Sequence, residues 1–108
     1  MRFDGFDWDA GNRLKCVKHG VSVLEIEAVF HGHPAVYPDL GHSDHERRSK
    51  VIGRLQSGRW VFLVFTLRHR DGATFIRPIS AQFMHAEEVA YYEKDAIRTE
   101  AHSDHDDR

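Results

Sequence analysis

The pattern of apolar and polar residues is most informative at positions 59–82, where two β-rich runs flank the dipeptide Asp71-Gly72. This dipeptide suits a two-residue hairpin turn, because both residues tolerate positive φ. The first run, residues 60–67, is apolar at nearly every position, which predicts a strand buried on both faces. The second run contains Pro78, which lacks the N–H that a strand ladder needs. We therefore expect an edge strand or a β-bulge at Pro78.

The hairpin turn also predicts which side chains share a face of the sheet. With a two-residue turn, Thr66 lies opposite Arg77, and Arg68 lies opposite Phe75. Arg68 and Arg77 are then diagonal neighbours on one face, whereas a slip of one residue would separate them. Two arginines that converge on a strand surface suggest an anion site. Solvated arginines at a sheet edge are the alternative.

Two short helices are predicted before the sheet. Asp9 is a candidate N-cap, and the first helix is expected to end near Gly20. Ser22 and Glu25 form a capping box for the second helix, which should stop before Gly32. The apolar positions at helical spacing are Ala10, Leu14, Val17 and Val21 in the first helix and Val23, Ile26, Val29 and Phe30 in the second.

The remaining segments complete an α+β domain. Short strands are predicted at residues 3–8, 35–37 and 48–55, with a polar loop at 38–46 and a third helix at about 85–99. Consecutive strands joined by short turns favour an antiparallel meander. We expect one domain over residues 1–100, packed by two N-terminal helices and one C-terminal helix. Residues 101–108 read as a disordered tail rich in acidic residues and histidine.

The composition limits the number of domains and the cellular compartments to be considered. Its 108 residues are 41% hydrophobic, enough for a single core. Cys16 is the single cysteine, so an internal disulfide is excluded, which fits a reducing cytoplasm. No stretch resembles a signal peptide or a membrane span. We therefore expect a cytoplasmic protein without a membrane partner.

The net charge of −2 hides a basic segment in the centre of the chain. Residues 47–77 contain eight basic side chains and one acidic side chain, which gives a net charge of +7. A basic sheet on a mildly acidic protein suggests a local site for a polyanion. The basic residues are Arg47, Arg48, Lys50, Arg54, Arg59, Arg68, Arg70 and Arg77.

Other chemistries have weaker support in the sequence. Three histidine pairs with short spacing occur among nine histidines, but neither a cysteine cluster nor an HExxH motif accompanies them. We predict neither a metal nor any other cofactor, although a His-rich metal-binding protein remains an alternative. GxSxG and GxGxxG motifs are absent. The pairs are His31 and His33, His42 and His45, and His102 and His105.

Several short motifs together resemble the BrnT family in order and spacing. The segment Lys18-His-Gly-Val21 closes the first predicted helix, and Ile52-Gly-Arg54, Thr66-x-Arg68 and Ile79-Ser-Ala81 lie on successive predicted strands. The motif Phe6-Asp-Trp-Asp9 precedes them. The similarity extends over about residues 6–92.

This resemblance implies a type II toxin with a RelE-like fold and ribonuclease activity that blocks translation. It also implies neutralisation by a BrnA-type antitoxin, which would connect the toxin to DNA only indirectly, through repression of their own operon. The family uses basic strand residues and no metal. The matching catalytic positions are Arg54, Arg68, Arg77 and Lys18, and the candidate RNA-binding positions are Arg48, Lys50, Thr66 and Gln82.

RNA cleavage needs a group that accepts the 2′-OH proton and cations that stabilise the charged phosphate. Arginine suits the second role, because its planar fork binds phosphate and stays charged. Lys18, His45 and Glu46 are candidates for proton transfer, and the sequence does not choose among them.

The chain departs from the family pattern at Gln82, where the family usually has an arginine. Glutamine can hydrogen-bond a phosphate but cannot neutralise it. Two functions therefore stay open. The chain is either an active ribonuclease toxin or a catalytically weakened homologue that acts as a binding module with its antitoxin in autorepression.

Overall fold

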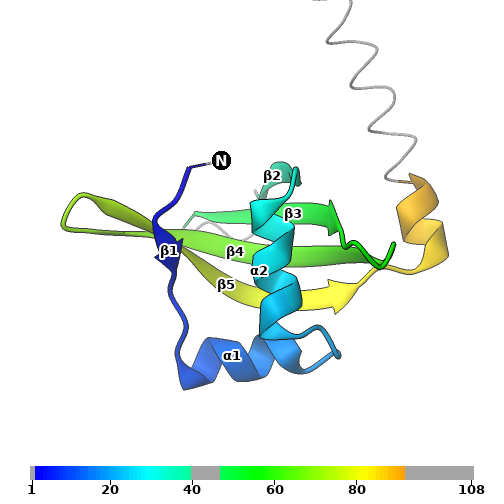
Figure 1. Ribbon diagram of the computed structural model, residues 1–108, viewed down its shortest axis with the longest axis horizontal. Coiled ribbons are helices and arrows are strands. Elements are labelled where there is room, and N and C mark those ends of the chain that lie inside the picture. The colour runs from blue at the N-terminus through cyan, green and yellow to red at the C-terminus, as the bar shows by residue number, and fades with distance from the viewer. Residues whose placement is uncertain (1, 40–46, 92–108) are drawn as a thin grey trace, which may run out of the picture.

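The computed structural model describes residues 2–39 and 47–91, and it confirms the predicted α+β fold (Figure 1). Two N-terminal helices pack on a five-stranded, mostly antiparallel sheet, and a helical segment at residues 86–91 follows the last strand. This arrangement is consistent with a RelE-like fold. The elements are β1 (Gly5–Phe6), α1 (Ala10–Val17), α2 (Val23–His31), β2 (Ala35–Asp39), β3 (Arg48–Arg54), β4 (Trp60–Arg70) and β5 (Ala73–Phe83).

The strand order across the sheet is β1-β5-β4-β3-β2. Strands β2 to β5 form the predicted antiparallel meander. The short strand β1 was expected, but its partner was not: it adds to the outer side of β5 in parallel. Helices α1 and α2 lie between β1 and β2 in the chain, and this intervening chain lets β1 reach the far edge of the sheet.

The predicted hairpin register is confirmed. Thr66 pairs with Arg77, and Arg68 pairs with Phe75. Asp71 and Gly72 have φ values of 51° and 82°, which are the left-handed conformations that a two-residue turn of this kind requires.

The bulge expected at Pro78 is also confirmed. Phe65 pairs with Pro78, whereas its neighbour Val64 pairs with Ser80, so that Ile79 is the extra residue on β5. Because Pro78 cannot donate to the ladder, the strand tolerates this irregularity at little additional cost.

The prediction that β4 is buried on both faces is wrong. Its burial alternates, with Val61, Leu63 and Phe65 fully buried and the residues between them only half-buried. The buried face lies under α2, where the rings of Phe30 and Phe65 meet edge to face at 5.0 Å. Gly53 on β3 lets α2 approach closely, because a Cβ there would lie 2.7 Å from Val29 Cγ1.

The predicted apolar stripe of the first helix is confirmed at Val21, which is fully buried, and is wrong within α1 itself. Leu14 is 71% exposed and Val17 is 37% exposed, whereas Asn12 and Cys16 are buried. Asn12 explains the rotation of the helix, because its Nδ2 donates to the carbonyls of Asp7 and Pro78, each at 2.9 Å. The helix therefore docks by satisfying a carbonyl at the β5 bulge. An apolar stripe cannot do this.

Both predicted helix starts are confirmed as reciprocal capping boxes. Asp9 accepts from the Asn12 amide and its own amide donates to the Asn12 side chain. Ser22 and Glu25 make the same exchange at α2. The predicted α2 face is buried at Ile26, Val29 and Phe30.

Other predictions fall on residues that the structure does not describe. These are most of the 38–46 loop, the third helix beyond residue 91 and the 101–108 tail. None of the helices in the described part of the chain has the length and apolar content that a membrane-spanning helix needs.

Replacing Asn12 tests the docking of α1. We expect Asn12→Ala to lower the free energy of unfolding by about 1–3 kcal/mol, because it leaves two backbone carbonyls without their donor and removes half of the capping box. Urea denaturation measures the change. Arg13→Ala, on the exposed side of the same helix, is the control and should change stability by less than about 0.5 kcal/mol. Equal effects of the two substitutions would contradict this account.

Candidate nucleic-acid interface

The side chains of β4 divide between the two faces of the sheet. Val61, Leu63 and Phe65 point toward α2, so the alternate residues point away from the two helices. We call this second face the basic face. The register places seven of the eight predicted site residues on it: Arg48, Lys50, Arg54, Thr66, Arg68, Arg77 and Gln82.

These residues lie in rows across the sheet. Thr66 on β4 is flanked directly by Arg48 on β3 and by Arg77 on β5. Arg68 lies two residues further along β4, diagonal to both. We call these four residues the Thr66 cluster. It gathers three guanidinium-bearing side chains around one strand position.

Thr66 itself is buried, with 3% of its surface exposed. Its hydroxyl donates to the carbonyl of Arg47 at 2.7 Å. This bond fixes the start of β3 against β4. The Thr66 hydroxyl is thus already engaged within the protein.

Arg77 turns toward the β5 edge and is shared by two carboxylates. Its Nη2 donates to Asp9 Oδ2 at 2.9 Å, and its Nη1 lies 3.6 Å from Asp7 Oδ2. Asp7 also accepts from Arg70 at 3.0 Å. The hydrogen bond from the Asn12 amide and the Arg77 guanidinium both hold the pKa of Asp9 below its ordinary value. Arg77 therefore joins the basic face to the start of α1.

Arg54 lies at the other end of the basic face. It pairs with Trp60, six residues before Thr66 on β4, which is about 20 Å along the strand. Its guanidinium lies 5.9 Å from the Trp60 ring, and its Nε donates to the Gly58 carbonyl. The structure therefore brings Arg68 and Arg77 into one cluster but does not bring Arg54 to it.

Lys18 lies apart from the basic face. It is the C-cap of α1, and α1 contributes Cys16 to the core on the helix side of the sheet. Gln82 is exposed and pairs with Phe62, two rows from the Thr66 cluster. The other proton-transfer candidates, His45 and Glu46, lie outside the described residues.

Within the described part of the chain, neither a reactive thiol at Cys16 nor a metal site is supported. Cys16 is fully buried, and burial raises the pKa of its thiol to about 11, so the thiol stays protonated and unreactive at neutral pH. No group of three or more potential ligand side chains is found within residues 2–39 and 47–91. Of the histidine pairs, the structure describes His31 and His33 alone.

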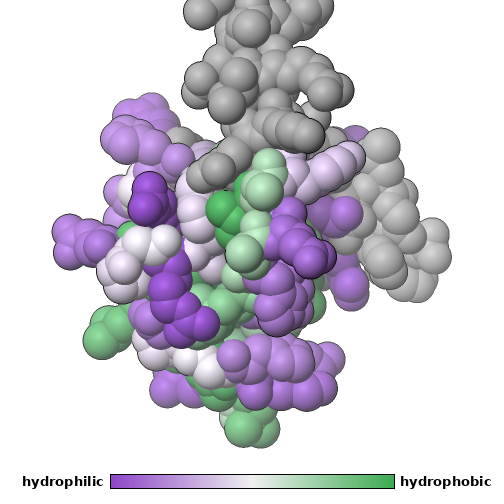
Figure 2. Space-filling view, turned by 90° about the vertical axis from the view of Figure 1, so that its right-hand side faces the viewer, coloured by the Kyte–Doolittle hydropathy of each residue, from purple (hydrophilic) through white to green (hydrophobic). Residues whose placement is uncertain are grey.

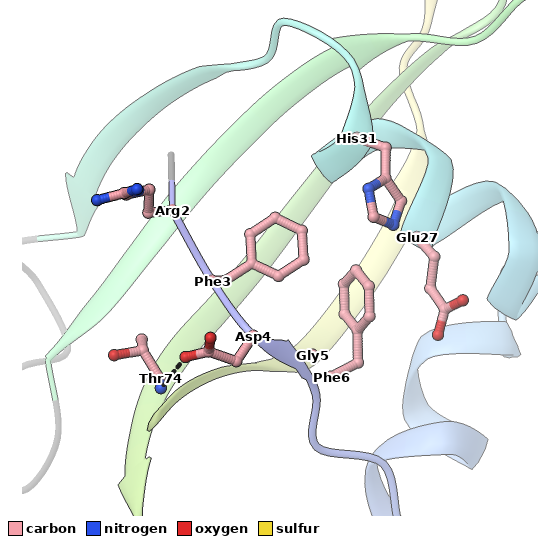
Figure 3. Close-up of a pocket in the computed structure, with 8 residues that line it drawn as sticks. All are labelled: Arg2, Phe3, Asp4, Gly5, Phe6, Glu27, His31 and Thr74. Carbon is pink, nitrogen blue, oxygen red and sulfur yellow. Dashed lines mark hydrogen bonds between the residues drawn. The ribbon is translucent and has the colours of Figure 1, made fainter. Parts of the chain in front are cut away.

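A hollow of about 760 Å³ lies on the helix side, between β1 and α2 (Figure 3). The rings of Phe3, Phe6 and His31 point toward one another there, with centroids 5.2–5.8 Å apart. The carboxylates of Asp4 and Glu27 also line the hollow. Arg2 also lines the hollow, but the two carboxylates outnumber this one cation and disfavour a phosphate, so this hollow is unsuited to the RNA backbone.

Two aromatic residues of the basic face were not predicted from the sequence. Trp60 and Phe62 alternate with core residues and are half-buried on the same face as Arg54 and Gln82. Both belong to the apolar run that we had interpreted as buried on both faces. Arg54 lies directly across from Trp60 in the strand register. The short loop between these two residues would have suggested this pairing.

The ion pair between Arg77 and Asp9 predicts that the stability of the protein depends on pH. Because the folded-state pKa of Asp9 is lowered, its stabilising contribution is present above the ordinary value of 3.8 and is lost as the pH falls through the lowered value. Asp9→Asn keeps a capping side chain but removes the charge. We expect the variant to be less stable than the wild type at pH 7 and to converge with it once the pH falls below the lowered pKa of Asp9. If the urea midpoints of the wild type and of Asp9→Asn differ by the same amount at every pH in this range, the ion pair contributes nothing.

The comparison with known families agrees with the geometry. The sequence profile described as "Ribonuclease toxin, BrnT, of type II toxin-antitoxin system" matches residues 8–88, three quarters of the chain. No curated protein matches the chain. The matched segment runs from Trp8 through β5 and so includes the whole Thr66 cluster. The chain belongs to the BrnT family of ribonuclease toxins of type II toxin–antitoxin systems, and it is an endoribonuclease toxin.

Proposed function

We propose that this toxin binds and cleaves RNA on its basic face, with Arg68 as the principal phosphate ligand of the Thr66 cluster. The observation that carries the proposal is the confirmed strand register, which puts Arg48, Arg68 and Arg77 around Thr66. Lys50 lies in the next row and adds a fourth cation. A site with several fixed cations favours phosphate in its most charged state.

The roles that we assign to the residues of the Thr66 cluster follow from the position and burial of each side chain. Arg77 is already paired with Asp7 and Asp9, so its charge is partly neutralised. Arg68 is half-buried on a central strand, where its guanidinium loses little conformational freedom on binding. We assign Arg77 a positioning role and Arg68 the direct contact, with Arg48 and Lys50 extending the binding track along the backbone.

The reaction that suits this site is metal-free transesterification. The 2′-OH gives its proton to water as its oxygen attacks the adjacent phosphorus. The bond to the 5′-oxygen breaks, this oxygen takes a proton from water, and a cyclic phosphate and a 5′-hydroxyl result. Arginine stabilises the added negative charge of the pentavalent phosphate but does not accept the 2′-OH proton. Lys18 lies on the helix side, so we propose that charge and positioning supply most of the rate. The consequence in the cell is the arrest of translation.

A type II toxin implies a cognate antitoxin. We propose that this partner is of the BrnA type and that the toxin reaches DNA only through it. The alternative function, a weakened nuclease that acts mainly as a binding module, is favoured by Gln82. This residue is exposed on the basic face and carries no charge.

Removing Arg68 tests the site. We expect Arg68→Ala to lower the rate of RNA cleavage by about 100-fold, as the loss of one fixed donor to a developing charge does elsewhere. Expression of the variant should no longer arrest growth. Cleavage of a fluorescent RNA is measured with EDTA present, which should leave the wild-type rate unchanged. Arg13→Ala on exposed α1 is the matched control, and a folded Arg68→Ala protein with full activity would contradict the assignment.

Restoring the family's arginine tests the alternative. We expect Gln82→Arg to raise cleavage about 10-fold, because it adds one charge-assisted contact to the substrate phosphate. A wild type without activity and an active Gln82→Arg variant would establish the weakened toxin. Equal activity of the two proteins would show that this position is not needed for catalysis.

A further inference from the structure

The sheet ends in an apolar hollow that the Thr66 cluster does not use. The hollow has a volume of about 350 Å³ and lies between Trp60 and the residues that follow β5. The side chains of Met84, Ala86 and Val89 line it together with Trp60. Figure 2 looks onto this end of the sheet and shows apolar residues near its centre with hydrophilic residues around them.

Arg54 lies beside the hollow, and an aromatic ring restrains it. Arg54 lies over the Trp60 ring at 5.9 Å, and its Nε donates to Gly58 O at 3.3 Å. Arg59 also lines the hollow, but its guanidinium lies 3.4 Å from the centre of the Phe83 ring, which packs against the core on the helix side of the sheet. Such contacts restrict long side chains before a ligand arrives, which lowers the entropy cost of binding an anion.

We propose that this hollow holds an unpaired base of a single-stranded RNA substrate, with Arg54 at an adjacent phosphate. The inference rests on the proposed RNA-binding face and extends it to a substrate class. An apolar hollow with an aromatic wall suits the flat surface of a base, and the neighbouring Arg54 suits the charged backbone.

The geometry favours single-stranded over double-stranded RNA. The bases of a duplex are stacked and paired, so a protein reads the duplex mainly through its backbone and minor groove. An aromatic hollow can take up a base only after that base has left the stack. Trp60 lies about 20 Å along β4 from Thr66, a span that several unstacked nucleotides of one strand can cover.

The two tryptophans of the chain allow a direct test. Trp8 donates to Glu27 on the helix side, whereas Trp60 lines the hollow. Trp8→Phe leaves Trp60 as the single tryptophan reporter, and Trp60→Phe leaves Trp8 as the matched control. Each variant is titrated with a 2′-O-methyl oligonucleotide, which cannot be cleaved, in single-stranded and in duplex form.

We expect the single strand to quench the fluorescence of the Trp8→Phe protein in a saturable way and to leave that of Trp60→Phe nearly unchanged. The duplex should quench neither. Ala86→Phe, which fills the hollow from an exposed position, should weaken single-strand binding about 10-fold and leave duplex binding unchanged. This second variant keeps the test decisive if changes at Trp60 disturb the fold.

The outcomes separate this inference from the proposed function. Absence of quenching in Trp8→Phe, or equal quenching by the duplex, overturns the inference even if cleavage still depends on Arg68. Quenching by the single strand in a protein that cleaves no RNA supports the inference and counts against the nuclease site. A fluorescence change of Trp60 on addition of the antitoxin alone would assign the hollow to a protein partner and overturn the proposal.

Discussion

The alternation of side chains along β4 is the constraint on which the rest of the structure depends. Phe65 and its apolar neighbours at every second position lie under α2, and this burial fixes which face each intervening residue takes. A slip of one residue would turn Thr66 and Arg68 to the helix side of the sheet and expose the core. The hydrophobic effect thus aligns the arginines indirectly: it sets the register, and the register gathers the charges.

The β5 bulge connects this sheet to the N-terminal helix. Pro78 interrupts the ladder, and its carbonyl accepts from buried Asn12 on α1. The residue before it, Arg77, reaches Asp9, the cap of the same helix. One irregular strand position therefore anchors α1 twice, through an amide and through an ion pair. This anchoring draws Arg77 toward the sheet edge.

The sequence was sufficient where the signals are local or follow from one turn. The N-cap at Asp9 and the capping box at Ser22 depend on neighbouring residues, and the Asp71-Gly72 turn determined the pairing of Thr66 with Arg77. The buried side of α1 could not be predicted, because the partner of Asn12 is 66 residues away and is a backbone carbonyl freed by a bulge. Leu14 and Val17 follow a helical period, yet they are exposed for this reason.

The candidate site also has features that the sequence predicts and features that it does not. Charge density in residues 47–77 predicted a basic face, and the register confirmed that seven of the named residues share it. Distance along the strand was not evident from the motifs, so Arg54 was grouped with Arg68 although the two lie at opposite ends of β4. The half-buried aromatic residues were hidden in an apolar run that composition alone could not divide between two faces.

Mapping of amide chemical shifts during titration with a non-cleavable RNA tests the central claim most directly. We predict that the largest changes fall on β3 and β4 at Lys50, Thr66 and Arg68, with small changes along α2. Changes confined to α1 and α2, with β3 and β4 unaffected, would contradict the assignment of the RNA site to the basic face.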